Sequence, residues 1–265
     1  MNTDMSQTSS ALVLSHLYNV KWETRLYAMQ KSLDSLLESI GNPIIKPNDP
    51  VVIARLLRGR ANTTLDCSGQ AISLAKHCEN LTFSDLVVIV GMSYFSWHDK
   101  DYTEKTMNAY LARRDGQKYT PLHIFPEITK STYGLLLYRE QAVDLVIRIT
   151  DMSRSEAQQL GRDLRKRLLE ASEYKSMFMS LGEKKGFSKE ELSAYWHTLE
   201  HDAQMRIDQK FSLTVSWILY QIEYISTYHS EELEKVTNLF EKTSDIKGYL
   251  AEIEKNNSIN LPYNL

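Results

Sequence analysis

The chain has 265 residues, of which 42% are hydrophobic and 25% charged, and its formal net charge is -3. This composition is typical of a globular protein and excludes an intrinsically disordered chain. The small negative charge excludes a global electrostatic attraction to nucleic acid, so any DNA-binding surface must be a local basic patch. Only ten glycines and six prolines are present, which together with long stretches of 3.6-residue periodicity predicts a mostly helical fold.

Secretion, membrane insertion and metal binding find no support in the sequence. The amino terminus lacks a basic segment followed by an apolar one, so no secretory signal is predicted. The most apolar stretch, residues 211–228, is interrupted by Gln221 and Glu223, which favours a buried helix over a membrane span. Cys67 and Cys78 lack the close spacing of a metal-binding or redox pair. We therefore expect a reduced, cytoplasmic protein without a cofactor.

The first predicted helix is marked by apolar residues that recur at three- and four-residue steps. It ends at Gly41 and Pro43, and its apolar face consists of Leu26, Met29, Leu33, Leu36, Leu37 and Ile40. Asn48, Asp49 and Pro50 then cap a short helix that is predicted to continue through Arg58. A further helix is predicted over residues 68–79, and Ser84 is predicted to cap another that includes residues 86–90.

The second half of the chain alternates predicted helices with connections. In chain order these are a loop at 94–103, a helix at 107–114, a long connection at 117–132, a helix at 134–149, a helix that follows Ser153, and helices at 189–201 and 211–228. Ser153 and Glu156 form the pattern of a capping box, and Ser188 is placed to cap the helix that follows it. Ser230 is predicted to open a last amphipathic helix that runs toward Lys242.

The most informative segment is residues 132–141, which read TYGLLLYREQ. This segment resembles part of the fingers of the alpha subunit of bacterial DNA polymerase III, where the run reads roughly TYGIILYQEQ. The resemblance continues to residues 160–167, LGRDLRKR, which correspond to LRRAMGKK in the family. Residues 68–85 and 195–233 also follow the family in order and spacing, so that the resemblance covers about residues 51–239.

The resemblance implies an all-α fold of the polymerase III fingers type with a helical N-terminal extension. We expect an N-terminal tail and helical extension at 1–50, the fingers-like domain at 51–240, and a C-terminal helix and tail at 241–265. In the family the catalytic palm precedes the fingers and supplies paired carboxylates that hold two magnesium ions. The aspartates before the fingers here are Asp4, Asp34 and Asp49, which are widely spaced and form no paired-carboxylate motif.

Three loops that shape the polymerase active site also depart from the family pattern. The family elements RPGP, FQLES and GFNKSHS correspond to YFSW at 94–97, TLDCS at 64–68 and RIDQKFS at 206–212. Because these loops and the palm carboxylates do not match, the comparison implies a chain that is not an enzyme and has no catalytic residue.

The strongest binding candidates are four clustered basic residues, Arg162, Arg165, Lys166 and Arg167. On a helix Arg162 and Lys166 share one face, and clustered donors of this kind suit phosphate oxygens. In the resembled family the matching basic residues approach the triphosphate of the incoming nucleotide and nearby DNA. Arg165 replaces a family glycine, and Gly161 replaces a family arginine. The alternative is a solvated helix face whose charge is balanced by acidic neighbours, Asp163 and Glu170.

Two further basic residues are weaker candidates for phosphate contact. Lys210 lies one position from a family lysine, and Arg139 stands where the family usually has a different residue. The pattern HTLEH, with His197, Glu200 and His201, matches a zinc-hydrolase motif, but no third ligand stands out and a structural helix explains the stretch. No metal site is therefore predicted.

Aromatic and acidic residues supply the remaining candidates. Tyr94, Phe95 and Trp97 can either stack on unpaired bases or pack beneath a loop, and packing is the favoured interpretation. Asp99 and Asp101 are interpreted as part of a solvated loop. The stripe formed by Tyr220, Tyr224 and Tyr228 is explained by core packing without any ligand.

Two functions from different classes remain open at this point. The leading hypothesis is a non-catalytic protein that binds single-stranded or primed DNA through phosphate contacts. The alternative is a protein-interaction module that binds a replication or polymerase partner, or that pairs with a separate palm-bearing chain. Neither hypothesis involves a membrane.

Overall fold

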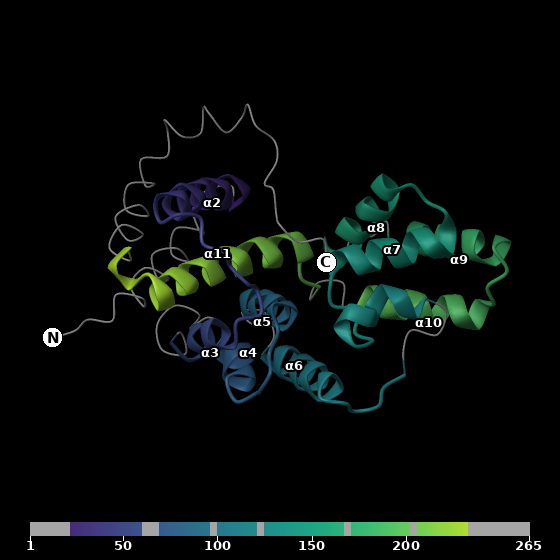
Figure 1. Cartoon of the computed structure of the whole chain (residues 1–265). Helices are drawn as coiled ribbons and strands as arrows, with labels where there is room; N and C mark the ends of the chain where they lie inside the picture. The colour runs from purple at the N-terminus through teal and green to yellow at the C-terminus, as the bar shows by residue number, and fades with distance from the viewer. Residues whose placement is uncertain are drawn as a thin grey trace. The chain divides into compact units, whose positions relative to one another are not determined.

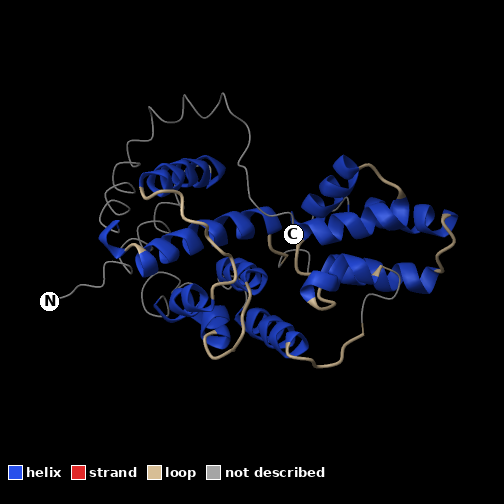
Figure 2. Ribbon diagram, viewed as in Figure 1, coloured by secondary structure: helices blue, strands red, loops and turns tan. Residues whose placement is uncertain are grey.

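The computed structural model describes residues 22–59, 69–95, 100–120, 125–166, 171–201 and 206–232 (Figures 1 and 2). These segments consist of helices and connecting loops, and their only β-pairing is an isolated parallel bridge between Tyr138 and Ile207. The predicted all-α fold is confirmed. The helices are α2 Trp22–Ser39, α3 Pro50–Gly59, α4 Gly69–Ala75, α5 Phe83–Phe95, α6 Lys100–Arg114, η1 Pro126–Thr132, α7 Arg139–Thr150, α8 Arg154–Lys166, α9 Ala171–Lys184, α10 Lys189–His201, α11 Gln209–Tyr228 and η2 Ser230–Glu232.

The chain divides into two compact units. Unit 1 contains residues Met1–Met107 and Lys210–Leu265, and unit 2 contains residues Asn108–Gln209. The chain passes from unit 1 into unit 2 within α6 and returns to unit 1 at Lys210, the second residue of α11. The domain boundaries expected near residues 50 and 240 stay a prediction.

Unit 1 is built around α11, which is buried along most of its length. Phe83 of α5 packs edge-on against Trp217 and Tyr220, with ring centroids 5.7 and 5.6 Å apart. Glu223, one of the polar residues that interrupt the apolar stretch, accepts a 2.8 Å bond from Arg55 of α3. Glu223 is thus paired within unit 1, and within the described segments no helix is long and apolar enough to cross a membrane.

A hydrogen-bonded network joins the end of α11 to the loop before α3. Asp49 caps α3 as predicted, because its carboxylate accepts bonds from the N–H groups of Val51 and Val52. The hydroxyl of Tyr220 donates to the Lys46 carbonyl at 2.6 Å and accepts from the Asp49 N–H at 2.9 Å. The Tyr228 hydroxyl also donates to Asp49. Two tyrosines of the predicted stripe therefore connect α11 with the loop before α3 in unit 1.

Two predicted features of unit 1 are wrong. The cap of α5 is Thr82 rather than Ser84, because the Thr82 hydroxyl accepts from the Asp85 N–H while Asp85 accepts from Thr82. The loop predicted at 94–103 is largely helical, since α5 extends to Phe95 and α6 begins at Lys100. Thr103 is fully buried in α6, so that the segment contributes to the core of the protein.

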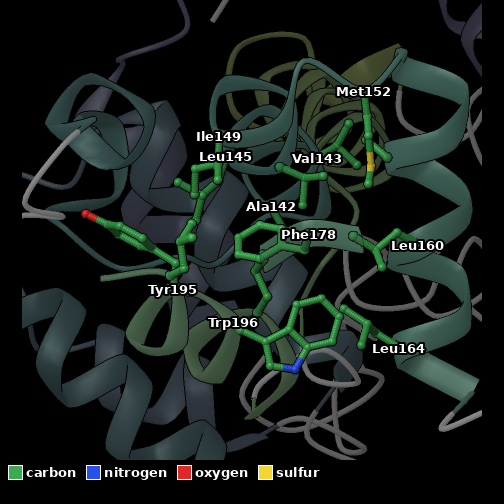
Figure 3. Packing of buried hydrophobic residues seen from close by; sticks show 14 residues of the cluster. Ala142, Val143, Leu145, Ile149, Met152, Leu160, Leu164, Phe178, Tyr195 and Trp196 are labelled. Atoms are coloured by element: carbon green, nitrogen blue, oxygen red, sulfur yellow. The ribbon is translucent and has the colours of Figure 1, made fainter. Parts of the chain in front are cut away.

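Unit 2 is a helical bundle closed around two aromatic residues. Phe178 of α9 and Trp196 of α10 are almost fully buried, with ring centroids 5.4 Å apart. Figure 3 shows Leu160 and Leu164 of α8 pointing toward this pair, with α7 contributing Ala142, Val143, Leu145 and Ile149. At Gly182 of α9 a Cβ atom would lie 2.3 Å from Leu192 of α10, so glycine permits the close approach of these two helices.

The capping predictions in unit 2 are confirmed. Ser153 and Glu156 bond reciprocally at the start of α8, and Ser188 and Glu191 do the same at the start of α10. Ser230 opens only the short 3₁₀ helix η2, and the rest of the amphipathic helix predicted toward Lys242 lies outside the described residues.

The burial of Tyr220 makes the stability of unit 1 sensitive to alkaline pH. Burial raises the pKa of the Tyr220 phenol to about 12, and the Asp49 carboxylate adds to the shift while the Asp49 N–H opposes it. Because an unfolded tyrosine titrates near pH ~10, the stabilising contribution is complete below that pH and is lost as the pH rises toward 12. We expect the unfolding free energy to fall by roughly 2 kcal/mol in this window through this group alone.

Urea unfolding of the native chain and of Tyr220→Phe between pH 8 and pH 12 measures this effect. The variant should be less stable at pH 8, because two hydrogen bonds are lost, and the difference should shrink as the pH rises. Two stability curves that run parallel over the whole range would contradict the prediction.

Candidate nucleic-acid interface

The segment 132–141 forms a tight turn that leads from η1 into α7. Tyr133 and Gly134 both adopt left-handed backbone angles, with φ of 50° and 79°. A Cβ atom at Gly134 would lie 2.5 Å from the ring of Tyr119, so only glycine fits there. The helix predicted to begin at Gly134 therefore begins five residues later, at Arg139.

One buried side chain, Gln141, holds this turn together. Its Oε1 atom accepts bonds from the backbone N–H groups of Leu137 and Tyr138 at 3.0 and 2.9 Å. Its Nε2 atom donates to the Ile128 carbonyl at 3.0 Å and to the Thr132 hydroxyl at 2.8 Å. Gln141 thus supplies hydrogen-bond partners both to the turn and to the backbone that enters α7. This shared role explains why the glutamine occurs together with the threonine and glycine of this segment.

The same turn anchors the segment that precedes α11. Leu137 and Arg139 exchange backbone hydrogen bonds of 2.9 Å with Ile207, which forms the isolated parallel bridge. The Glu140 carboxylate accepts from the N–H of Gln209, at the first residue of α11. An acceptor at a helix N-terminus is favourable because the first N–H groups have no partner within the helix.

Arg206 enters the site from this anchored segment. The residue is 3% exposed, and its two terminal nitrogens donate to the carbonyls of Leu199 and Thr198, near the end of α10. A guanidinium in this position binds carbonyls that lack partners within the helix. The Arg206 carbonyl in turn accepts a 3.0 Å bond from Nε of Arg139.

These contacts surround a cavity of about 200 Å³ on unit 2. Three segments contribute to it, namely the start of α7, one face of α8 and the segment before α11. The described residues that line the cavity are Arg139, Glu140, Ala142, Val143, Arg154, Gln158, Gly161, Arg162, Arg165, Arg206 and Asp208. We call this set of residues the arginine pocket.

The arginine pocket has an excess of positive charge. Its described lining contains five guanidinium groups and two carboxylates. Arg154 bonds to Asp144 at 2.8 Å, whereas among the described residues Arg162 bonds only to the neutral amide of Gln159. The ion pair between Arg139 and Asp208 is long, at 3.9 Å.

Arg165 carries the least compensated charge in the pocket. It is half-buried and makes no hydrogen bond or ion pair with any residue that the structure describes. Burial lowers the pKa of its guanidinium, the positive charges of Arg139 and Arg162 lower it further, and Asp208 opposes this effect. Since arginine keeps its proton in proteins, the shift reflects an unfavourable environment that a bound anion would improve.

The structure brings three of the six predicted binding residues together, namely Arg139, Arg162 and Arg165. Lys166 ends α8, but its side chain and the whole of Arg167 lie outside the described residues. Lys210 is exposed and belongs to unit 1. That these residues bind DNA stays a prediction.

The alternative interpretation of the basic face of α8 was that Asp163 and Glu170 balance its charge from solvated positions. The structure does not place Asp163 in such a position. Asp163 is only 6% exposed, and both of its oxygens accept from Nε2 of Gln159. It is therefore not a solvated counter-charge to Arg162. Glu170 lies outside the described residues.

Sequence reasoning missed Arg154, Arg206, Glu140 and Asp208 as members of the pocket. Arg154 stands at the first position of α8, one residue after the predicted cap, and the i, i+4, i+8 spacing to Gln158 and Arg162 was the available signal. No sequence spacing connects Arg206 and Asp208 with α8.

The other candidate residues do not form a second site. His197 and Glu200 are exposed on α10, whereas the His201 side chain is outside the described residues, as are Trp97, Asp99 and the side chains of Tyr94 and Phe95. Asp101 lies in the first turn of α6 instead of the predicted loop. Within the described ranges no group of three His, Cys, Asp or Glu side chains is placed to hold a metal ion.

Comparison with known proteins assigns the family. Residues 29–186 match the family described as "Bacterial DNA polymerase III alpha subunit finger domain". This match covers more than half of the chain and includes the whole of α3 to α9 as well as the second half of α2. The chain therefore belongs to this finger-domain family. The family match begins inside the helix that sequence analysis had placed before the resemblance.

Curated relatives support the same assignment. The chain is 21% identical over 203 residues to DNA polymerase III subunit alpha of Aquifex aeolicus, and 23% identical over 217 residues to that of Treponema pallidum. These matches cover 75% and 80% of this chain but only 17% and 18% of the relatives. The protein of the same name from Thermus aquaticus is 22% identical over 194 residues, which is 70% of this chain and 15% of the relative. The chain thus spans about a sixth of the length of these relatives.

The role of Gln141 in building the site can be tested by removing its amide. We expect Gln141→Leu to lower the unfolding free energy by about 3 kcal/mol, because the buried N–H groups of Leu137 and Tyr138 lose their acceptor. Urea denaturation provides the measurement. Gln117→Leu, at an exposed glutamine of the same unit, is the control and should change stability by less than about 0.5 kcal/mol. Equal effects of the two substitutions would contradict the proposed role.

Proposed function

We propose that this chain is a non-catalytic nucleic-acid-binding protein that contacts the phosphates of single-stranded or primed DNA through the arginine pocket and the adjoining basic end of α8. The observation that carries this proposal is the convergence of five arginines from α7, α8 and the segment before α11 in one cavity. Membership in the finger-domain family supports a role near DNA.

The charge distribution is consistent with a local binding surface. The whole chain carries a formal charge of -3, so that it gains nothing from long-range attraction to DNA. The pocket concentrates arginine, whose planar fork matches phosphate oxygens and whose charge persists at all physiological pH values. Lys166 and Arg167 follow directly in sequence and are included in the proposed surface.

The absence of catalysis is part of the proposal. The loop that corresponds to the family element GFNKSHS contains Arg206, Ile207 and Asp208, and these residues are engaged in helix capping, the parallel bridge and the pocket lining. Polymerase chemistry requires paired carboxylates that hold two metal ions. The family that this chain matches is the finger domain, and the proposal therefore assigns it binding and not polymerisation.

Salt-dependent DNA binding tests the proposal. We expect single-stranded and primed DNA to bind with an affinity that falls steeply as salt rises. Arg162→Glu combined with Lys166→Glu should weaken binding by at least about tenfold for every sequence, and should reduce the salt slope. Arg162 is exposed and bonds only to Gln159, so its replacement leaves the core intact. Fluorescence anisotropy across a salt series gives both quantities.

A matched control separates a local effect from a change in net charge. Lys175→Glu combined with Lys184→Glu alters the charge by the same amount on exposed positions of α9, in the same unit. This control should bind DNA like the native chain at moderate and high salt. Equal loss in both double variants would reject the proposed surface. No DNA binding by the native chain at moderate salt would reject the proposed function and favour the protein-interaction module.

A further inference from the structure

The dimensions of the arginine pocket contain information about its ligand. Its cavity of about 200 Å³ is smaller than the 300–1,000 Å³ typical of sites that enclose a drug-sized molecule. A small, highly charged group therefore fits the space better than a complete nucleotide.

The arrangement of charge within the pocket also differs from that of a simple backbone-binding surface. An internal phosphodiester carries one negative charge and is linked to a nucleoside on both sides. Arg162 and Arg154 are exposed, but Arg165 and Arg139 are half-buried and Arg206 is buried. A terminal phosphate carries nearly two negative charges at neutral pH, has three free oxygens, and is tethered on one side only. It is the form of phosphate that can reach guanidinium groups below the surface.

From the cavity size and the partly buried arginines we infer that the arginine pocket binds the terminal phosphomonoester of a nucleic-acid strand. This inference rests on the proposed function and makes it specific, because it assigns the pocket to a strand end instead of the internal backbone. In this arrangement the phosphate oxygens receive hydrogen bonds from Arg165 and Arg162, and the first nucleoside lies at the mouth of the pocket.

Gly161 provides the opening through which such a group enters. This helical glycine belongs to the pocket lining, and a Cβ atom built on it would meet no atom within 4 Å. The absence of a side chain at this point leaves the partly buried arginines accessible. The pattern of the resembled family has arginine at this position, glycine at the position of Arg165 and glutamine at that of Arg139. The pocket is therefore a feature of this chain and not a consequence of the family pattern alone.

The decisive experiment compares four forms of one single-stranded oligonucleotide, carrying a 5′-phosphate, a 3′-phosphate, both or neither. We expect at least one phosphorylated form to bind at least about tenfold more tightly than the unphosphorylated strand, because a charge-assisted pair of hydrogen bonds is gained. The comparison of 5′- and 3′-phosphate identifies the strand end. Equal affinity for all four forms would overturn the inference and leave the proposed function standing, whereas binding of none would reject both.

Two variants connect the preference with the pocket. Arg165→Gln should abolish the preference, so that the phosphorylated and unphosphorylated strands bind with equal affinity. Because Arg165 makes no hydrogen bond or ion pair in the described part of the chain, the variant should melt at the native temperature or higher. A preference that survives in Arg165→Gln would place the phosphate elsewhere and overturn the assignment.

A matched pair at Gly161 keeps the test valid if Arg165→Gln fails to fold. Gly161→Glu and Gly161→Gln introduce side chains of nearly equal size into the open space above the pocket, and both favour the helix over glycine. Gly161→Glu should eliminate the preference for the phosphorylated strand, and Gly161→Gln should reduce it less. Equal behaviour of the two variants would contradict an electrostatic site at this position.

Free nucleotides separate a strand end from a soluble phosphate ester. Thymidine 5′-monophosphate should displace the phosphorylated strand at high concentration, and thymidine should not. If thymidine 5′-monophosphate binds as tightly as the phosphorylated strand, the pocket recognises a free nucleotide and the assignment to a strand end is overturned. Displacement by an acidic peptide but not by thymidine 5′-monophosphate would also overturn it.

Discussion

The architecture of unit 2 around its basic site depends on the side-chain amide of Gln141. This buried group makes four hydrogen bonds, two to the backbone that enters α7 and two to the turn that precedes it. Without these bonds the N–H groups of Leu137 and Tyr138 would be buried without acceptors, at a cost of about 1–3 kcal/mol each. The turn held by Gln141 places Arg139 at the pocket, pairs with Ile207, and lets Glu140 cap α11.

Residues 132–141 contain both the residues that build the turn and one residue that lines the arginine pocket. Thr132, Gly134 and Gln141 build the turn, because each is tied to a backbone conformation or a buried hydrogen bond. Arg139 lies in the same run but faces the cavity. The turn of the resembled family is therefore kept, while Arg139 places a positive charge where the family pattern has glutamine. Arg165 is half-buried, and the positive charges of Arg139 and Arg162 lower the pKa of its guanidinium, so that these three arginines of the pocket repel one another.

Much of the fold was predictable from local signals. The caps at Asp49, Ser153 and Ser188 were correct because capping depends on residues within one turn of the helix start. The start of α7 was predicted five residues too early, because the apolar run LLLY matches a helical pattern as well as an extended one. Only the left-handed backbone at Gly134, tightly covered by Tyr119, excludes the helix there.

The sequence by itself determined that the chain is helical, that it resembles polymerase fingers, and that basic residues cluster in α8. These properties depend on composition, periodicity and short spacings, which a linear pattern contains. The tertiary structure decided which of those basic residues form a site. Arg206 is separated by 40 positions or more from α8, and Arg139 by more than 20 from Arg162, so that only the parallel bridge at Ile207 and the turn around Gln141 bring them to one cavity. The physical reason is that residues far apart in the sequence meet only through contacts of the folded chain, here the parallel bridge and the buried hydrogen bonds of Gln141.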